Sequence, residues 1–306
     1  MQDWTREIEA AQARIGPHVR RTPVMEVTLG GHQVALKFEH VQHTGSFKTR
    51  GAFNTLLSAD VPDAGVVAAS GGNHGAAVAY AAAHLGHRAR IYVPEMAGPA
   101  KIALIERAGA DLVVMPGAYA NALEAARGYE AETGAMQIHA YDAAATVAGQ
   151  GTVMAEWEAQ GLQADTVLIA VGGGGLVAGA LAWLAGRRKV VAVEPRLSCA
   201  LSAALHAGGP VDVEVGGVAA NALGARRIGE ICFDLAKAHG AVSVLVEDAD
   251  IEAAQAMLWR DLRQIVEPAG AAALAALISG AYRPEPGERV AVLLCGANPS
   301  SLSFAD

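Results

Sequence analysis

The sequence has few cysteines, and its basic residues are sparse. The three cysteines, Cys199, Cys232 and Cys295, lie far apart and form no CxxC pair, which argues against a disulfide framework and a structural zinc site. We therefore expect a reducing compartment, the cytoplasm. The 23 Lys and Arg residues stand against 31 Asp and Glu residues, a net charge of −8, and no basic run is dense enough to neutralise a row of phosphates. Nucleic acid is therefore not an expected partner.

Long hydrophobic runs and aromatic residues are also scarce. Glycine or charge breaks every apolar stretch before the ~18 residues that a membrane span needs. The first residues, MQDWTREIEAAQARIG, have a charged, helical pattern instead of the apolar core of a signal peptide. We therefore expect no membrane partner. Only 5% of the 306 residues are aromatic, but 52% are hydrophobic, which is enough for the core of a globular protein.

Short β-prone runs alternate with helical patterns along most of the chain. The run 65–70 is followed by an alanine-rich helix at 75–86 and a strand at 88–94, which together form one βαβ unit. The strands lack strict polar alternation, which indicates parallel sheets covered by helices on both faces. We predict an α/β protein of two closely joined lobes. The pattern predicts further strands at 34–38, 111–116, 137–140, 166–171, 189–195, 243–247 and 289–295, and helices at 3–15, 98–108, 119–133, 146–160, 176–186, 249–262 and 269–279.

One motif places a lysine where it could react. In HTGSFKTRG, residues 43–51, Lys48 follows a Gly-Ser turn and stands close to the start of a helix. The positive end of a helix dipole favours the neutral amine, which is the form that attacks a carbonyl group. The alternative is a solvated surface lysine beside Arg50, and the local pattern alone favours this alternative.

Two glycine-containing turns each join a strand to a helix. VGGGGLVAG, residues 171–179, exposes backbone N–H groups at a helix start and suits a phosphate, although it is neither GxGxxG nor a P-loop. A closely packed turn is the alternative. SGGNHG, residues 70–75, suits a carboxylate in the same way. The ordinary interpretation makes Ser70 a helix cap and Asn73 a turn residue.

Together the three motifs describe a cleft that holds a phosphorylated carbonyl cofactor next to a lysine, which is the chemistry of pyridoxal phosphate. From about residue 20 to 298 the chain resembles the fold-type II pyridoxal-phosphate enzymes, and among them the serine/threonine dehydratases. The resemblance implies a two-lobed fold like that of tryptophan synthase β, with a large domain at 1–48 and 140–306, a small domain at 49–139 and the cofactor between them. The motifs that carry it are HTGSFKTRGAFN, SGGNHG, HAYDAAATVAGQGT, VGGGGLVAG, AVEP, VEPAGAAALAAL and VLLCGAN, in this order.

The resemblance also implies roles for individual residues. Lys48 corresponds to the lysine that forms the Schiff base, and Asn73 to the ligand of the pyridine hydroxyl. Cys295 falls beside the pyridine nitrogen, where a weakly polar partner suits elimination; a buried strand-end thiol is its alternative. Glu267 corresponds to a glutamate close to the cofactor, and a helix cap is its alternative. Further cofactor contacts are implied for Phe47, Gly172, Gly173, Gly174, Gly175 and Leu176, and substrate contacts for Ser70, Gly71, Asn73 and His74.

The chain departs from the resemblance at several positions. Serine racemases have a serine where this chain has Gly71, and glycine cannot move a proton, so dehydration is favoured over racemisation. His43 and Ala140 replace prolines that many dehydratases have, which leaves the substrate open.

Glu194 and the carbonyl near Ser198 correspond to the metal position of the family. A second carboxylate is missing, because Ala200 stands in its place, and a divalent cation needs several oxygens, ideally with more than one charged. We expect a monovalent cation, a weakly bound divalent cation or no ion.

The sequence thus predicts a pyridoxal-phosphate-dependent ammonia-lyase. It would convert a 3-hydroxy amino acid, with L-threonine and L-serine as leading substrates, into a 2-oxo acid and ammonia, in a homodimer or homotetramer. The alternatives are a racemase or β-replacement synthase of the same fold, a dehydratase for 3-hydroxyaspartate or phenylserine, a nucleotide-binding dehydrogenase and a silent binding protein.

Overall fold

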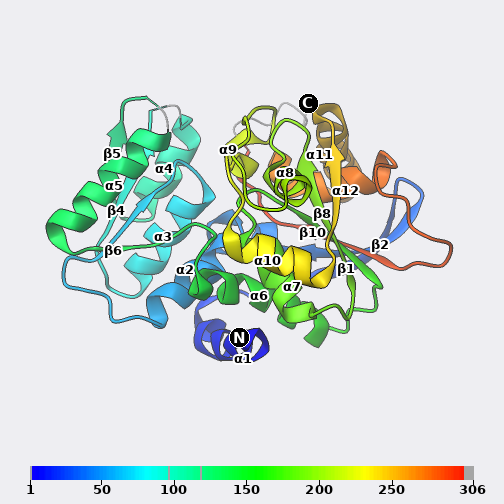
Figure 1. The fold of residues 1–306 in the computed structure, drawn as a ribbon, viewed down its shortest axis with the longest axis horizontal. Coiled ribbons are helices and arrows are strands. Elements are labelled where there is room, and N and C mark those ends of the chain that lie inside the picture. The colour runs from blue at the N-terminus through cyan, green and yellow to red at the C-terminus, as the bar shows by residue number, and fades with distance from the viewer. Residues whose placement is uncertain (1, 96, 118, 300–306) are drawn as a thin grey trace.

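The computed structural model describes residues 2–95, 97–117 and 119–299, and the chain builds two separate sheets (Figure 1). The larger sheet has six strands in the order β1-β2-β10-β7-β8-β9. All neighbouring pairs are parallel except β1 and β2, which are antiparallel. Its strands are β1 (Val24–Leu29), β2 (His32–Phe38), β7 (Thr166–Ala170), β8 (Lys189–Pro195), β9 (Val242–Val246) and β10 (Val290–Leu294).

The smaller sheet has four parallel strands in the order β5-β4-β3-β6. Helices α3, α4 and α5 follow its strands in the sequence and lie beside it in Figure 1, as a parallel βαβ arrangement requires. Its elements are β3 (Val66–Ala69), α3 (Asn73–His84), β4 (Ala89–Pro94), α4 (Pro99–Arg107), β5 (Asp111–Met115), α5 (Tyr119–Thr133) and β6 (Met136–Gln137).

The other helices belong to the chain segments before and after the smaller sheet. Among the described residues, none of the helices is both long and apolar enough to cross a membrane. They are α1 (Trp4–Ile15), α2 (Lys48–Leu57), α6 (Ala144–Ala159), α7 (Gly175–Leu184), α8 (Ala200–Ala207), α9 (Ala220–Leu223), α10 (Glu230–His239), α11 (Asp248–Leu262) and α12 (Pro268–Ile278), with short 3-10 turns η1 (Gly16–His18), η2 (Glu39–Val41) and η3 (His43–Gly45).

The core of the large sheet is built from small and branched apolar side chains. Every residue of β7 and β10 is buried, which explains why these strands read as continuous apolar runs. Alanine and glycine let the covering helices approach closely: a Cβ at Gly179 of α7 would overlap the backbone of Gly151 in α6. Close helix contact behind the sheet therefore depends on missing side chains.

Most predicted strands and helices agree with the structure within two residues, but several elements were missed. The prediction had no strand at β1 and no helix at α8, α9 or α10. β1 pairs with β2 through the two-residue turn Gly30–Gly31, whose φ angles of 55° and 85° suit a tight hairpin. The helix of the lysine motif, expected to start close to Lys48, begins at Lys48 itself.

Candidate active site

Lys48 is the first residue of α2 and is held against the end of β10. Phe47 donates its backbone N–H to the carbonyl oxygen of Cys295 at 3.2 Å, and Ser46 forms an isolated bridge with Gly296. The Lys48 amine donates to the carbonyl oxygen of Ala140 at 2.7 Å and lies 5.2 Å from the centre of the Phe47 ring. The lysine thus joins three segments that are far apart in the sequence.

The surroundings of the Lys48 amine favour its neutral form. Burial lowers the pKa of Lys48 from 10.5 to about 8, and the acidic groups of Cys295 and Glu267 oppose this shift only partly. The same surroundings lower the pKa of His74 to about 3, first through burial and then through the charge of Lys48. His74 is therefore a neutral imidazole that donates from Nε2 to the carbonyl oxygen of Ile138 at 2.9 Å.

The glycine run lies between β7 and α7, where the N–H groups of a helix start are unpaired. Gly174 precedes α7 with a φ of 95°, a conformation that glycine adopts without strain. A Cβ at Gly173 would overlap the ring of Tyr141. Within the described parts of the chain, no hydrogen-bond acceptor is assigned to the N–H groups of 173–176. The loop therefore offers a row of donors that suits a phosphate.

Asn73, Glu267 and Asn298 form a polar wall near Lys48. The side-chain amide of Asn73 donates to the Glu267 carboxylate. The side chain of Asn298 donates to the Asn73 Oδ1 atom and to the carbonyl oxygen of Thr44, both at 2.8 Å. Thr44 has a φ of 60°, which is unusual for a residue other than glycine. Asn298 thus links the start of α3 to the strained turn before Lys48.

Two further predicted site residues, Cys295 and Gly71, have close neighbours. Burial raises the pKa of the Cys295 thiol, which stays neutral and donates to the carbonyl oxygen of Ala269 at 3.3 Å. A Cβ at Gly71 would lie 2.6 Å from the Cβ of Ala97, which is too close for two carbon atoms. In the same turn, Ser70 accepts the backbone N–H of Gly72 at 3.2 Å.

Glu194 and Ser198 have structural partners. The two carboxylate oxygens of the buried Glu194 accept the backbone N–H groups of Leu201 at 2.7 Å and Ser202 at 2.8 Å, so Glu194 caps α8. Burial raises the pKa of Glu194 to about 7. The Ser198 hydroxyl donates to the carbonyl oxygen of Gly216 at 2.9 Å. Among the described residues no cluster of three His, Cys, Asp or Glu side chains could hold a metal, and both oxygens of the single carboxylate, Glu194, already accept backbone N–H groups.

Sequence reasoning gave no role to Tyr141, Asp142 or Asn298. Tyr141 packs over the glycine loop and Asp142 accepts the N–H groups of Glu230 and Ile231 at 3.1 Å each, so this segment connects the loop to α10. Asp142 stands three residues after His139 in the HAYD motif, and Asn298 ends the CGAN motif. Both motifs can be found in the sequence, but the residues that Asp142 and Asn298 contact cannot.

Comparison with known proteins defines the class. Residues 15–296 match the family model described as pyridoxal-phosphate dependent enzyme, and the chain belongs to this family. A phenylserine dehydratase from Ralstonia pickettii is 36% identical over 97% of this chain and 94% of its own length. A biosynthetic L-threonine dehydratase from Corynebacterium glutamicum is also 36% identical, over 98% of this chain and 72% of its own length.

Two solved structures share the fold. Maize serine racemase has a TM-score of 0.90 at 31% identity and covers 96% of this chain and 93% of its own. The T.th. threonine deaminase has a TM-score of 0.88 at 35% identity and covers 96% of this chain and 97% of its own. The predicted family, fold class and cofactor are confirmed. Two features of the described residues fit pyridoxal phosphate. The N–H groups of the glycine loop without an assigned acceptor suit its phosphate, and the Lys48 amine, whose lowered pKa favours the neutral form, suits its carbonyl carbon.

Proposed function

We propose that this enzyme dehydrates and deaminates a 3-hydroxy amino acid, with L-threonine and L-serine as leading substrates, to a 2-oxo acid and ammonia. The observation that carries the proposal is the buried Lys48 amine, whose pKa is lowered to about 8. The amine donates to the carbonyl oxygen of Ala140, and the next residue, Tyr141, packs on the glycine loop with its N–H donors. When bound, pyridoxal phosphate supplies the carbonyl carbon that takes the substrate's amino group and the ring that delocalises charge from its α-carbon.

Different residues around Lys48 would bind different parts of the cofactor and the substrate. We propose that the N–H groups of Gly172–Gly175 and Leu176 hold the phosphate. Asn73, fixed by Glu267, would hold the ring hydroxyl, and Phe47 would lie beside the ring. Cys295, a neutral thiol, would face the ring nitrogen without protonating it. Ser70, Gly71, Asn73 and His74 would bind the substrate carboxylate at the start of α3.

Lys48 is the residue we assign to proton transfer. Its Nζ atom, once neutral, accepts the proton from the substrate α-carbon, and the β-hydroxyl then leaves with a proton from its surroundings. Racemisation would need a second proton carrier on the opposite face. Gly71 has none, and the contact with Ala97 leaves no room for a side chain there. Elimination is therefore favoured over racemisation.

A bulkier 3-hydroxy amino acid such as phenylserine is the second candidate. Gly71 and Ala140 are smaller than the serine and proline that the related racemases and many dehydratases have at these positions, and a phenylserine dehydratase is among the relatives. The test is a panel of threonine, serine, 3-hydroxyaspartate and phenylserine, each in the L and the D configuration. Release of 2-oxo acid is expected and ranks the substrates, whereas formation of D-serine faster than pyruvate would replace elimination with racemisation.

We also propose an organisation for the whole molecule. The small sheet and its helices would form a domain over 49–139, and segments 1–48 and 140–306 the large domain, with the cofactor between them. The thiols of Cys232 and Cys295 are buried and unpaired, which supports a cytoplasmic location. A homodimer or homotetramer is expected from light scattering after size-exclusion chromatography. At Glu194 we propose a helix cap, so activity should not depend on a divalent cation.

A further inference from the structure

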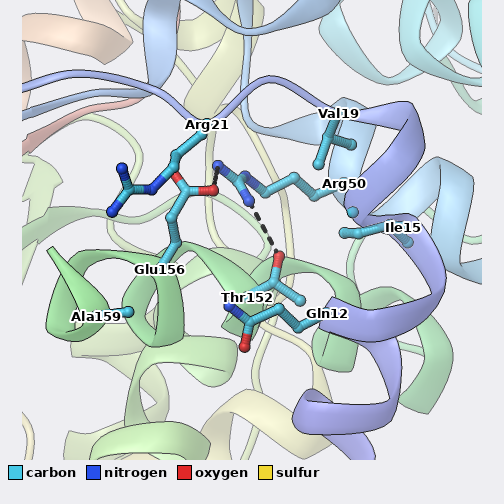
Figure 2. Close-up of a pocket in the computed structure, with 9 residues that line it drawn as sticks. Gln12, Ile15, Val19, Arg21, Arg50, Thr152, Glu156 and Ala159 are labelled. Carbon is cyan, nitrogen blue, oxygen red and sulfur yellow. Dashed lines mark hydrogen bonds and ion pairs between the residues drawn. The ribbon is translucent and has the colours of Figure 1, made fainter.

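A separate polar cavity lies behind the helix that carries Lys48. It has a volume of about 220 Å³ and opens between α1, η1 and the side of α6 (Figure 2). A water molecule in the liquid takes about 30 Å³, so the cavity has room for about seven waters or for a ligand with a similar number of heavy atoms. Gln12, Arg50, Thr152 and Glu156 supply its polar lining, and Ala159 stands at its edge.

Arg50 brings an unused hydrogen-bond donor to the cavity. The residue is 1% exposed. Its Nε and Nη2 atoms donate to Glu39 at 2.9 and 2.7 Å, and Nη2 also donates to Glu156 at 3.0 Å. The Nη1 atom carries two N–H groups but has a single long contact, 3.4 Å to the Thr152 hydroxyl. Among the described residues, one N–H of Nη1 therefore lacks an acceptor.

The charges around the cavity favour an anion. Burial disfavours the charge of Arg50, but Glu39 and Glu156 outweigh burial and raise its pKa. Lys37 donates to Glu156 at 2.6 Å, so two buried cations and two buried anions balance. Arg21 at the rim adds a positive charge with no anionic partner among the described residues. In Figure 2 its guanidinium turns away from Arg50, so it would attract an anion without bonding to it.

Gln12 adds a second free polar group. Its side chain extends from α1 toward Thr152 (Figure 2), and no hydrogen bond of this amide is found within the described part of the chain. The Thr152 hydroxyl donates to the carbonyl oxygen of Gly149 at 2.6 Å and accepts only the long contact from Arg50. The cavity thus offers two kinds of donor, a guanidinium and an amide, beside the Thr152 hydroxyl and the Glu156 carboxylate, and both oxygens of Glu156 already accept from Lys37 or Arg50.

We propose that this cavity is an effector site for a small carboxylate of about seven heavy atoms, held by Arg50 Nη1 and the Gln12 amide. Two sources share this chemistry: the 2-oxo acid product and the amino-acid substrate, a choice that rests on the proposed function. Arg50 stands two residues after Lys48 on α2. A carboxylate on Nη1 would draw the guanidinium away from Glu39 and Glu156, and this would shift the helix start that positions Lys48.

Calorimetric titration of the cofactor-loaded enzyme tests the site without turnover. The ligands are 2-oxobutyrate and, in a second arm, L-alanine, which lacks a β-hydroxyl to eliminate. Ala159→Trp puts a large side chain on an exposed residue of the cavity lining, and Ala10→Trp on α1, also exposed and outside the lining, is the matched control. The wild-type enzyme and Ala10→Trp should bind one more equivalent of 2-oxobutyrate or L-alanine per chain than Ala159→Trp. The same number of equivalents in all three proteins, with both ligands, would overturn the proposal.

The two arms identify the source of the carboxylate, and a second variant tests the contact. An extra site for 2-oxobutyrate alone assigns the product, and one for L-alanine alone assigns the substrate. Gln12→Leu should weaken the extra site about 3- to 10-fold; unchanged affinity would contradict the assigned contact. If the panel of hydroxy amino acids is not turned over, the proposed function fails while the calorimetric count still decides the site.

Discussion

The pKa of Lys48 makes a quantitative prediction about cofactor loading. Only the neutral amine attacks the carbonyl carbon of pyridoxal phosphate. With a pKa of about 8, about one amine in ten is neutral at pH 7. At the ordinary lysine value of 10.5, only about three in ten thousand would be neutral, so burial raises the reactive fraction roughly 300-fold. The apoprotein should therefore load cofactor at a rate that rises with pH and levels off above about pH 8.

The assay is stopped-flow absorbance of cofactor bound to apoprotein between pH 6 and 10. Because the cofactor itself titrates in this range, the rates are divided by those of a free lysine derivative mixed with the same cofactor. This ratio should be constant below about pH 8 and should fall about tenfold per pH unit above it, because the Lys48 amine is then already neutral while the free amine is not. The sign follows from burial, which disfavours the charged amine and so lowers the pKa. A ratio that stays constant up to pH 10 would refute the argument, since Lys48 would then titrate as a solvated lysine.

Three further predictions concern single positions. Asn298→Ala removes the donor that holds Asn73, which should shift the visible band of the bound cofactor and weaken its binding about fivefold, as expected for one hydrogen bond of about 1 kcal/mol. Gly174→Ala should lower the free energy of unfolding by at least about 1 kcal/mol in urea, because φ is 95° there. Gly71→Ser alone should yield no D-serine from L-serine, because the new side chain has no room.

Each of these predictions has a control. For Gly174, the control is Gly128→Ala in α5, where a Cβ meets nothing within 4 Å and stability should rise by about 0.5–1 kcal/mol; equal effects would remove the strain argument. For Asn298, an unchanged spectrum and affinity would show that Asn73 needs no support. For Gly71, Ala97→Gly on top of the serine restores space, and D-serine from the single variant would contradict the steric reasoning.

The sequence predicted elements whose signal is local. The strand and helix of the glycine run follow from an apolar segment, four glycines and an apolar helix, and each signal lies within about fifteen residues. β1 was missed although Met25, Val27 and Leu29 alternate with Glu26 and Thr28; most of its residues are exposed at the edge of the sheet. In the structure the strand is defined by its pairing with β2 across the Gly30–Gly31 turn.

The contacts that shape the candidate site depend on distant residues. The hydrogen bond from Asn298 to Asn73 joins positions 225 residues apart, and that from Arg50 to Glu156 joins positions 106 apart. A motif indicated that Lys48 could react, but its lowered pKa depends on burial among segments that are distant in the sequence, such as those of Ala140 and Cys295. Local patterns cannot report which distant side chains bury a group, so the electrostatics of the site required the structure.

The most direct test of the central claim is product release by the wild-type enzyme and Lys48→Ala, both supplied with pyridoxal phosphate. We predict that the wild type releases 2-oxo acid and ammonia in equal amounts from L-threonine or L-serine. Lys48→Ala should be slower by roughly a thousandfold or more, since it loses the group that accepts the α-proton. Full turnover by Lys48→Ala, or consumption of substrate by the wild type without ammonia, would contradict the account.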